Sequence, residues 1–325
     1  MYKGSGAIFR QRFMRFSPTR LANVVKLSLA MARLRLREIR NFYRYPRRLR
    51  FARDGGEGLR IVLYGIPFDD WNRPLTSPEL WEGIEEVTEV MRIPGSPVFA
   101  PVDDRPTVFI PMKDIHATRL PRGSRTLAPD RTSIAFLADK ERFASYLALA
   151  ALSNYRPLHY PDPDHAVFPC VVKRVDLSAS VGVAVARSRA HLDEILADTI
   201  FYGHRYLLQE LVPGNTECVA CFVCRQGRIL WDCTFETDMD GPAVVKREGS
   251  GRNRRQIQTP PQVIAAVEEV LIPLDYDGFC VIDYKVPRDG QAKILEINPR
   301  LGGTLLRPEH MPQLREAISC MLAAV

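Results

Sequence analysis

The chain has 325 residues, of which 46% are hydrophobic and 26% charged, a composition typical of a folded, soluble protein with more than one domain. It contains no run of about 18 apolar residues, and its N-terminus lacks an apolar segment followed by a cleavage site of small residues. We therefore expect neither a membrane span nor a secretory signal, and we expect a cytoplasmic location.

Positive charge is concentrated at the N-terminus. Residues 1–53 contain 15 Lys and Arg and a single acid, Glu38, which gives +14, so the rest of the chain carries −7 within a total of +7. The basic character therefore belongs to an N-terminal extension, which we place at residues 1–57.

A helix is predicted within this extension. Ser17 and Pro18 suit the N-cap and the first helical position, and helix-forming residues continue to Tyr43. The apolar positions spread too widely for one clean stripe. We interpret the segment as a basic helix on the body of the protein, with peripheral contact to an anionic membrane or to RNA as the alternative; no sequence-specific nucleic-acid motif is present.

The next region, residues 58–139, reads as a small α/β unit. "LRIVLYGIPF" at 59–68 predicts a strand, and "TVFIPM" at 107–112 predicts a second one. "SPELWEGIEEVTEVM" at 77–91 has helical spacing after a Ser-Pro cap.

From Asp139, a predicted helix cap, helices and strands alternate. "TECVACFVCRQGRILWDCTFET" at 216–237 predicts two strands around a turn at Gln226 and Gly227. Cys218 and Cys221 would then point to opposite faces of one strand, so buried free thiols are a better interpretation than a metal site.

A second hairpin carries the most unusual polar residues. Asp289-Gly290 between two apolar strands predicts a two-residue type I′ turn, which places Asp283 directly opposite Glu296. Alternation then divides the side chains between two faces: Asp283, Lys285, Glu296 and Asn298 on one, and Ile282, Tyr284, Leu295 and Ile297 on the other.

Two directly opposed carboxylates repel each other, so a cation is expected between them. Oxygen donors from two acids and one amide, without His or Cys, suit Mg²⁺. The alternatives are solvent-facing edge residues, or neutralisation by Lys285 alone.

"VIDYKV" followed by "ILEINPRLGG" resembles the metal-binding hairpin of ATP-grasp enzymes. The resemblance implies an α/β (α+β) ATP-grasp fold over residues 140–325, with subdomains at 140–210 and 211–325. It implies ATP and two Mg²⁺ ions, with Mn²⁺ as a substitute, as cofactors. Asp283, Glu296 and Asn298 would hold the metal, and Arg300 would stabilise charge on the reacting groups.

Other segments resemble the same family in the same order. In "LADKERF" and "FPCVVKRVDLSASVGV", Lys140 and Lys173 would reach the nucleotide phosphates, covered by a loop that includes Ser180 and Gly182. In "LLQELVPGNTECV", the residues that would contact the adenine and the ribose are Glu210, Leu211, Val212 and Glu217.

Two features depart from the family pattern. The phosphate loop is poor in glycine, and Val281 stands where several relatives carry an arginine. Lys285, Arg300 or an arginine of residues 247–256 would have to replace that charge. The latter segment is interpreted as a mobile loop over the phosphates or a solvated basic loop. Residues expected to contact substrate are Arg252, Arg254, Gly302, Gly303 and Arg307.

The resemblance implies a ligase that joins a carboxylate to an amine through an acyl phosphate, with ATP and both substrates as its partners. The alternatives are the same chemistry with another acceptor, a kinase-like activity, or a non-catalytic nucleotide-binding regulatory protein. The sequence leaves both substrates and the oligomeric state open.

Overall fold

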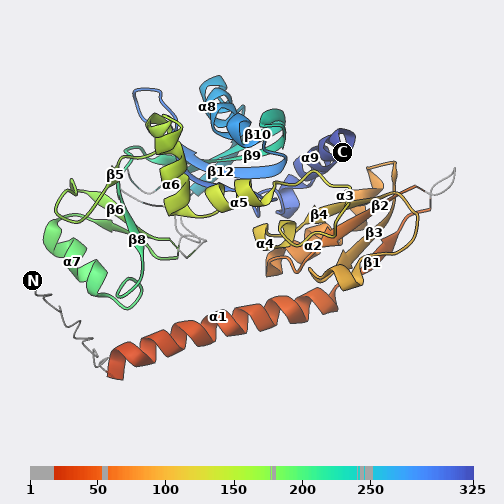
Figure 1. Ribbon diagram of the computed structural model, residues 1–325, viewed down its shortest axis with the longest axis horizontal. Coiled ribbons are helices and arrows are strands. Elements are labelled where there is room, and N and C mark those ends of the chain that lie inside the picture. The colour runs from red at the N-terminus through yellow and green to blue at the C-terminus, as the bar shows by residue number, and fades with distance from the viewer. Residues whose placement is uncertain are drawn as a thin grey trace, which may run out of the picture.

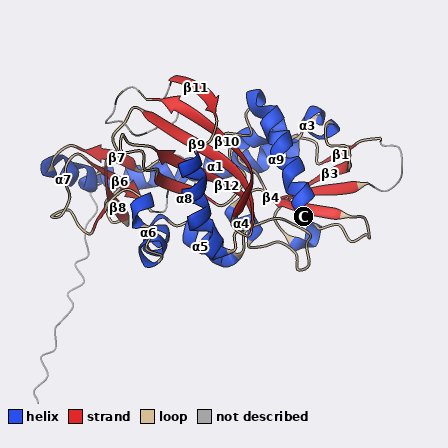
Figure 2. Ribbon diagram, turned by 90° about the horizontal axis from the view of Figure 1, so that it is seen from above, coloured by secondary structure: helices blue, strands red, loops and turns tan. Residues whose placement is uncertain are grey.

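A computed structural model describes residues 18–52, 58–175, 177, 181–239, 241, 245 and 252–325. It contains three sheets, with helices packed between and around them (Figure 1, Figure 2). In the described residues, no helix is both long enough and apolar enough to cross a bilayer.

The first sheet has the order β1-β3-β2-β4, in which only β1 is antiparallel to its neighbour. Its strands are β1 (Arg48–Arg50), β2 (Leu59–Tyr64), β3 (Val87–Ile93) and β4 (Thr107–Pro111). Short helical segments lie between these strands: η1 (Asp69–Trp71), α2 (Asn72–Leu75), α3 (Pro78–Glu82) and η2 (Pro97–Phe99). Helix α4 (Asp114–Ala117) follows β4.

The prediction of one helix over residues 77–91 is wrong beyond its first turns. Helix α3 begins at Pro78 as expected, but its C-cap is Gly83, a residue that disfavours helix continuation. The following residues form β3, whose β-branched positions Val87 and Val90 are buried in the sheet. Tertiary burial thus overrides the helical spacing.

The second sheet, β5-β8-β6-β7, is antiparallel and forms the left end of Figure 1. Its strands are β5 (His159–Tyr160), β6 (Cys170–Arg174), β7 (Val183–Ala186) and β8 (Tyr206–Glu210), and helix α7 (Arg189–Ala197) packs on it. This small unit has its own apolar core, built around Val172, Leu192 and Leu208.

The third sheet, β11-β10-β9-β12-β13, is the largest and is also antiparallel. Its strands are β9 (Thr216–Arg225), β10 (Arg228–Asp238), β11 (Arg252–Ile257), β12 (Gly278–Lys285) and β13 (Lys293–Asn298). The β9–β10 turn confirms the prediction: Gln226 and Gly227 both have positive φ, of 50° and 75°.

Helices cover both faces of this third sheet. One face packs with α5 (Arg131–Leu137), α6 (Lys140–Leu149) and α8 (Pro261–Leu271), which η4 (Ile272–Leu274) extends. As predicted, Asp139 caps α6, accepting from the amides of Glu141 and Arg142 at 2.9 Å each. A 3-10 turn, η3 (Ser153–Tyr155), follows α6.

The other face packs with α9 (Met311–Ala324), which follows η5 (Pro308–His310). Leu314 and Ile318 of α9 are fully buried in a core that also includes Ile61 and Trp81 of the first region and Val219 and Cys221 of β9. The first sheet and the third sheet therefore share one core. Cys218 packs in the opposite layer from Cys221, as the strand alternation predicted, and both thiols are free.

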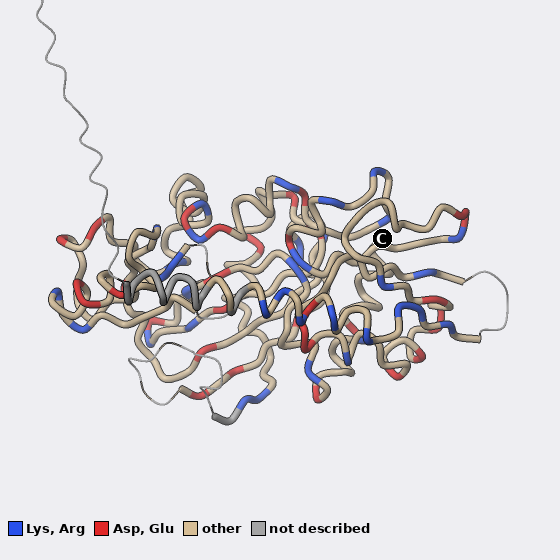
Figure 3. Tube along the Cα trace, turned by 90° about the horizontal axis from the view of Figure 1, so that it is seen from below, with Lys and Arg blue, Asp and Glu red and all other residues tan. Residues whose placement is uncertain are grey.

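Helix α1 (Pro18–Arg44) lies along the lower edge of the molecule in Figure 1, and several of its described residues are Lys or Arg, coloured blue in Figure 3. Among the side chains of α1 that the structure describes, those of the last turns contact the body: Phe42 is fully buried, and Glu38 forms an ion pair with Lys113 at 2.9 Å. Pro18 is the first described residue of α1, and Ser17, predicted as its N-cap, lies outside the described residues.

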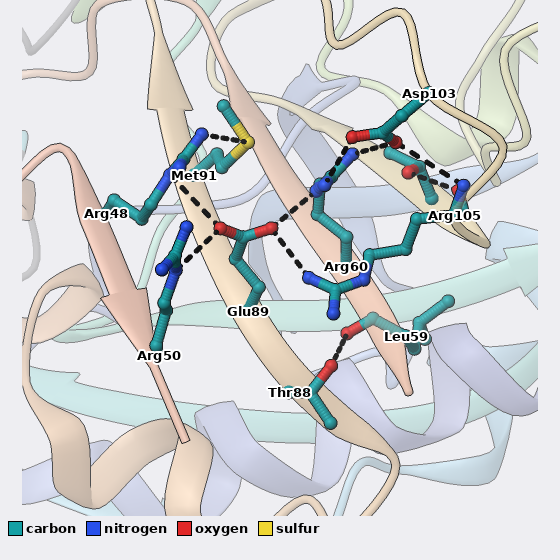
Figure 4. A network of polar contacts seen from close by, with 10 residues as sticks. Arg48, Arg50, Leu59, Arg60, Thr88, Glu89, Met91, Asp103 and Arg105 are labelled. Atoms are coloured by element: carbon teal, nitrogen blue, oxygen red, sulfur yellow. Dashed lines mark hydrogen bonds and ion pairs between the residues drawn. The ribbon is translucent and has the colours of Figure 1, made fainter. Parts of the chain in front are cut away.

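A buried carboxylate joins the strands of the first sheet on the side away from the shared core. Burial by itself raises the pKa of Glu89, but the arginines around it outweigh that effect and hold the pKa below its usual value. Figure 4 shows the cluster, in which the distances from arginine nitrogens to Glu89 oxygens are 2.6 Å for Arg60, 2.9 Å for Arg105, 3.1 Å for Arg48 and 3.4 Å for Arg50.

Candidate active site

The β12–β13 hairpin has the predicted register at its acidic end. Asp283 pairs with Glu296, and Val281 pairs with Asn298. The predicted two-residue type I′ turn is wrong, because residues 286–292 connect the strands and only Gly290, with φ of 81°, takes a positive angle there. The longer connection leaves the opposed acids in place.

A β-bulge changes the register beyond Asp283. Tyr284 pairs with Ile294 and Lys285 with Lys293, so Leu295 is an extra residue in β13. The prediction that Leu295 fills the core face is wrong: Ile294 takes that place, and Leu295 lines the pocket beside Lys173. Its carbonyl oxygen lies 3.5 Å from the Lys173 ammonium nitrogen.

Two lysines face the acidic end of the hairpin. The Nζ of Lys140, at the start of α6, lies 3.7 Å from Glu296 Oε1 and donates to the Leu177 carbonyl at 2.7 Å. Lys173 projects from β6, and burial lowers its pKa, an effect that the charges of Glu296 and Glu217 oppose. An anionic ligand in this pocket would stabilise the charged lysines further.

The hairpin offers oxygen donors to a hard cation. Within the part of the chain that the structure describes, no three His, Cys, Asp or Glu side chains converge as a metal cluster. The set at the hairpin is instead two carboxylates, Asp283 and Glu296, with the amide of Asn298 on the same strand as Glu296. Such a donor set fits Mg²⁺ when water and phosphate oxygens complete the coordination.

A second part of the pocket lies between the small sheet and the third sheet. Its walls include Leu211 and Val212, in the segment that joins β8 to β9, and the charged pair Glu217 and Lys285. Glu210, at the end of β8, accepts from the Leu158 amide at 2.9 Å through its carboxylate. The predicted adenine and ribose residues therefore do line one pocket.

Lys285 does not neutralise the opposed acids. It is 4% exposed and donates to the carbonyls of Val212 and Gly214, at 3.4 and 3.0 Å. Burial lowers its pKa, and Glu217 opposes that effect. Lys285 thus fastens the segment before β9 rather than replacing an arginine at position 281.

The loop predicted to cover the phosphates is described only at its ends. Ser180 lies outside the described residues, as do residues 176, 178 and 179. Gly182 has φ of 70°, and a Cβ there would lie 2.7 Å from Arg174 Cγ. Glycine is therefore needed where the chain enters β7.

Arg300 connects the hairpin to the first region of the chain. Its guanidinium donates to Asn298 Oδ1 at 2.9 Å and forms an ion pair with Asp114 at 3.2 Å, although the latter does not have hydrogen-bond geometry. It also lies over the rings of Phe68 and Trp71, 5.4 and 5.8 Å from their centroids.

Burial perturbs the groups beside Arg300. Desolvation raises the pKa of Asp114, and the charge of Arg300 only partly offsets it. Desolvation, with help from Lys113 and Arg119, lowers the pKa of His116 to about 4. Desolvation is thus the largest influence on the pKa of both side chains.

The two glycines after Arg300 allow a close approach between elements. A Cβ on Gly302 would lie 2.3 Å from Val281 Cγ2, and one on Gly303 would lie 3.0 Å from Trp71 Nε1. Val281 therefore packs directly on the turn that follows the hairpin.

The segment of residues 247–256 is described only from Arg252 onward. Residues 246–251 lie outside the described residues, but 252–257 form β11, so the interpretation of 252–256 as a loop is wrong: pairing with β10 satisfies their backbone. Arg254 is near Asp283 and Arg307, and burial, then Arg307, lower its pKa. Arg252 begins β11, and its side chain is outside the described part.

Arg307 lies on the surface, 3.8 Å from Glu309. His310 is buried, stacks on Phe235 with 4.0 Å between the ring centroids, and places Nδ1 2.6 Å from the Thr304 carbonyl oxygen. Its role here is packing.

Sequence reasoning missed several residues of this site. Arg156 and Gln209 line the pocket with buried polar atoms that have no hydrogen-bond partner in the described structure. Asp114, Phe68 and Trp71 reach the site from the first region. No local motif marks them, because only the tertiary fold brings them to Arg300.

Two antiparallel sheets thus hold a pocket lined by lysines and carboxylates between them, in an α+β architecture. Residues 137–304 match the family model of the ATP-grasp domain. The chain belongs to the ATP-grasp family.

Curated relatives are ligases that this chain matches in part. It is 28% identical over 160 residues to the D-alanine–D-alanine ligase of Gloeobacter violaceus, covering 43% of this chain and 49% of that protein. It is 24% identical over 213 residues to the phosphoribosylamine–glycine ligase of Ralstonia nicotianae, covering 58% and 50%. The chain thus spans about half the length of these relatives.

Solved structures share the fold. D-alanyl-alanine synthetase A from Vibrio cholerae has a TM-score of 0.56 at 13% identity, covering 83% of this chain and 97% of that one. The phosphoribosylamine–glycine ligase of Thermotoga maritima has a TM-score of 0.52 at 17% identity, covering 78% and 70%. The likeness confirms the expected α+β ATP-grasp fold.

Proposed function

We propose that this protein is an ATP-dependent ligase that joins a carboxylate to an amine through an acyl phosphate. The observation that carries the proposal is the opposition of Asp283 and Glu296 in β12 and β13, with Lys140 and Lys173 across the pocket. An ATP-grasp domain with this arrangement can hold the triphosphate between cationic and metal-binding walls.

Each group has a proposed role in binding ATP. Lys140 and Lys173 bind phosphate oxygens, covered by the loop of Ser180 and Gly182. The backbone of Leu211 and Val212, with Glu210, reads the adenine, and Glu217 the ribose. Asp283, Glu296 and Asn298 would hold Mg²⁺, or Mn²⁺ in its place, which when bound neutralises charge on the transferred phosphoryl group.

The proposed reaction has two displacements. A carboxylate oxygen of the first substrate attacks the γ-phosphorus, and ADP leaves with the electrons of the broken P–O bond. The amine nitrogen then attacks the acyl carbon, phosphate leaves with the electrons of the C–O bond, and the amine loses a proton. Arg300 stabilises the negative charge that collects on the reacting oxygens.

The acid substrate is placed near Arg300 and the turn of Gly302 and Gly303, where a carboxylate meets the guanidinium and the rings of Phe68 and Trp71. Arg252, Arg254 and Arg307 are proposed as further substrate contacts on the β11 side. The names of the curated relatives include D-alanine and glycine, so amino acids are the first substrates to test.

The test is ADP release from Mg-ATP in the presence of mixtures of amino acids, followed by mass spectrometry of the product. We expect Asp283→Asn and Glu296→Gln each to lower the rate by about 100-fold, the usual effect of removing an electrostatic group from the reacting centre. Glu194→Gln, on the exposed side of α7, is the matched control and should keep full activity.

The product distinguishes the competing functions. An amide-bonded product supports the ligase, whereas a stable phosphorylated product would indicate a kinase-like enzyme. Failure to bind Mg-ATP by calorimetry, or full activity of both carboxylate variants, would contradict the proposal.

A further inference from the structure

Helix α1 has one face that is anchored to the protein. Asn41 donates to Asp69, and Arg37 pairs with the same carboxylate at 2.6 Å. Glu38 is buried against Lys113, and Phe42 is buried under the guanidinium of Arg92, 4.7 Å from its ring centroid. The position and angle of the C-terminal half of α1 are therefore fixed by the first region.

The opposite face carries an exposed apolar stripe. With 100° per residue, residues spaced by three and four positions align along a helix. The stripe consists of Leu29, Ala32, Leu36, Ile39 and Tyr43, whose large members are 50%, 66%, 42% and 55% exposed in the order Leu29, Leu36, Ile39, Tyr43. The wide spread of apolar residues in the sequence thus resolves into a docked face and an outward stripe.

Basic side chains flank this stripe. Arg33, Arg35, Arg40 and Arg44 are all exposed, and Figure 3 shows the basic residues along the helix. Glu38 is the one acid among residues 1–53, and it is buried and paired. The outward face therefore presents leucine and isoleucine between positive charges, with no acid from α1.

This chemistry favours one kind of partner. A second copy would bring two sets of arginines together without acids to pair them. RNA contacts use arginines and aromatic stacking, for which Leu29, Leu36 and Ile39 are not suited. An anionic lipid surface can bind both kinds of side chain, because the apolar stripe packs against acyl chains and the arginines pair with the anionic headgroups.

We propose that the outward face of α1 docks on an anionic lipid surface, with its axis in the plane of the interface. The stripe enters the boundary between headgroups and acyl chains, while Arg33, Arg35, Arg40 and Arg44 bind headgroup phosphates. The anchored face holds the catalytic body next to that surface. This inference is independent of the ligase reaction.

The test is flotation of the full-length protein with vesicles of phosphatidylcholine alone and of phosphatidylcholine with phosphatidylglycerol. We expect binding only to the anionic vesicles, weakened by salt. Leu36→Gln with Ile39→Gln should lower the partition coefficient by about tenfold, since each of the two apolar side chains would otherwise be about half-buried in the lipid interface. Arg33→Gln with Arg40→Gln should lower it by about 25-fold, because each basic residue near the surface contributes roughly fivefold.

The matched control is Leu149→Gln with Leu230→Gln, two side chains that are 87% and 47% exposed away from α1. It should bind as the wild type does, and all variants should keep the wild-type circular dichroism spectrum and melting temperature. Absence of binding to anionic vesicles, or unchanged binding by the stripe variant, would overturn the proposal. The proposal would also be overturned if single-stranded RNA displaced the protein from the vesicles. A dimer of the wild-type protein in sedimentation experiments that is absent in the stripe variant would overturn it as well.

Discussion

Arg300 is held by two groups that come from different parts of the chain: it donates a hydrogen bond to Asn298 in the hairpin next to it and forms an ion pair with Asp114 in α4. Because Asp114 is desolvated and its pKa is raised, its charge depends on the nearby guanidinium. The pair therefore fixes where the guanidinium points, and Asp114 is a positioning residue rather than one that reacts.

We predict that Asp114→Asn lowers kcat for ADP release by about tenfold, the usual effect of losing one charged partner, and leaves the calorimetric Kd for Mg-ATP unchanged. Asp114→Glu should recover part of the rate. Asp70→Asn, an exposed acid in η1, is the control. Equal loss of nucleotide affinity would show that Asp114 supports the fold instead.

His116 makes stability depend on pH. Burial lowers its pKa from 6.5 to about 4, so the unfolded chain binds a proton at this position between those pH values while the native protein does not. The stabilisation is complete above pH 6.5 and is lost as pH falls toward 4, by about 3 kcal/mol for a shift of this size.

Urea unfolding at about pH 7 and about pH 5 would measure this effect. We expect His116→Gln to reduce the difference in the free energy of unfolding between the two pH values, because glutamine does not titrate. His165→Gln, an exposed histidine paired with Asp162 in a surface turn, serves as the comparison and should leave most of that difference in place. An unchanged difference in His116→Gln would contradict the assignment.

Among the elements, strand β13 illustrates how a bulge separates two neighbouring side chains. Ile294 is 1% exposed in the core under α6 and α8, whereas Leu295 lines the pocket. We predict that Ile294→Ala lowers the free energy of unfolding by about 3 kcal/mol with little effect on ATP affinity. Leu295→Ala should do the reverse, with a loss of less than about 1 kcal/mol in stability and a weaker Kd for ATP.

The two measurements are urea unfolding and calorimetry with Mg-ATP. A regular strand without the bulge would give the opposite result, with Leu295→Ala the more destabilising change. The pair of variants thus tests the register directly.

The sequence predicted β9, β10, β12 and β13 of the third sheet and the opposition of Asp283 to Glu296, because the alternation of side chains along a strand is a local signal. Residues 252–256, which belong to β11, were interpreted as a loop. The sequence did not predict the bulge, since Leu295 and Ile294 are equally apolar and only packing against α6 and α8 chooses between them. The sequence predicted a helix where β3 lies, because the spacing of apolar residues does not show that this segment is buried next to β2. Helices α8 and α9 were not assigned at all.

The sequence also did not predict which distant segments contact one another at the candidate site. Lys140 and Lys173 could be assigned through the family resemblance, and their side chains do reach the hairpin. Asp114 and Arg156 have no motif around them. Their place follows from how the first region and the small sheet pack against the hairpin, which a single sequence does not specify.

At the scale of the whole molecule, the hydrophobic cores differ in how many elements share them. The first sheet, α9 and one face of the third sheet share a core, while the small sheet with α7 has a separate one. Cooperative opening is expected to follow these boundaries, because residues that share a core lose their packing together.

We predict that Ile318→Ala, in α9, lowers hydrogen-exchange protection in β2, β4 and β9 at once. Leu192→Ala, in α7, should lower it only across β5 to β8. Both side chains are almost fully buried, so the two changes are matched. Loss of protection confined to β9 in the α9 variant would show that the first region is stable by itself. Mass spectrometry of peptides after exchange gives the comparison.

The place of α9 in that shared core has a consequence during synthesis. Trp81 and Ile61 emerge from the ribosome long before Leu314 and Ile318, which cover them in the finished protein. Until α9 has been synthesised, the apolar surface that it covers stays exposed on the nascent chain, and chaperones bind exposed apolar surface of this kind. Translation speed over the intervening segment should therefore influence how much protein reaches the native state.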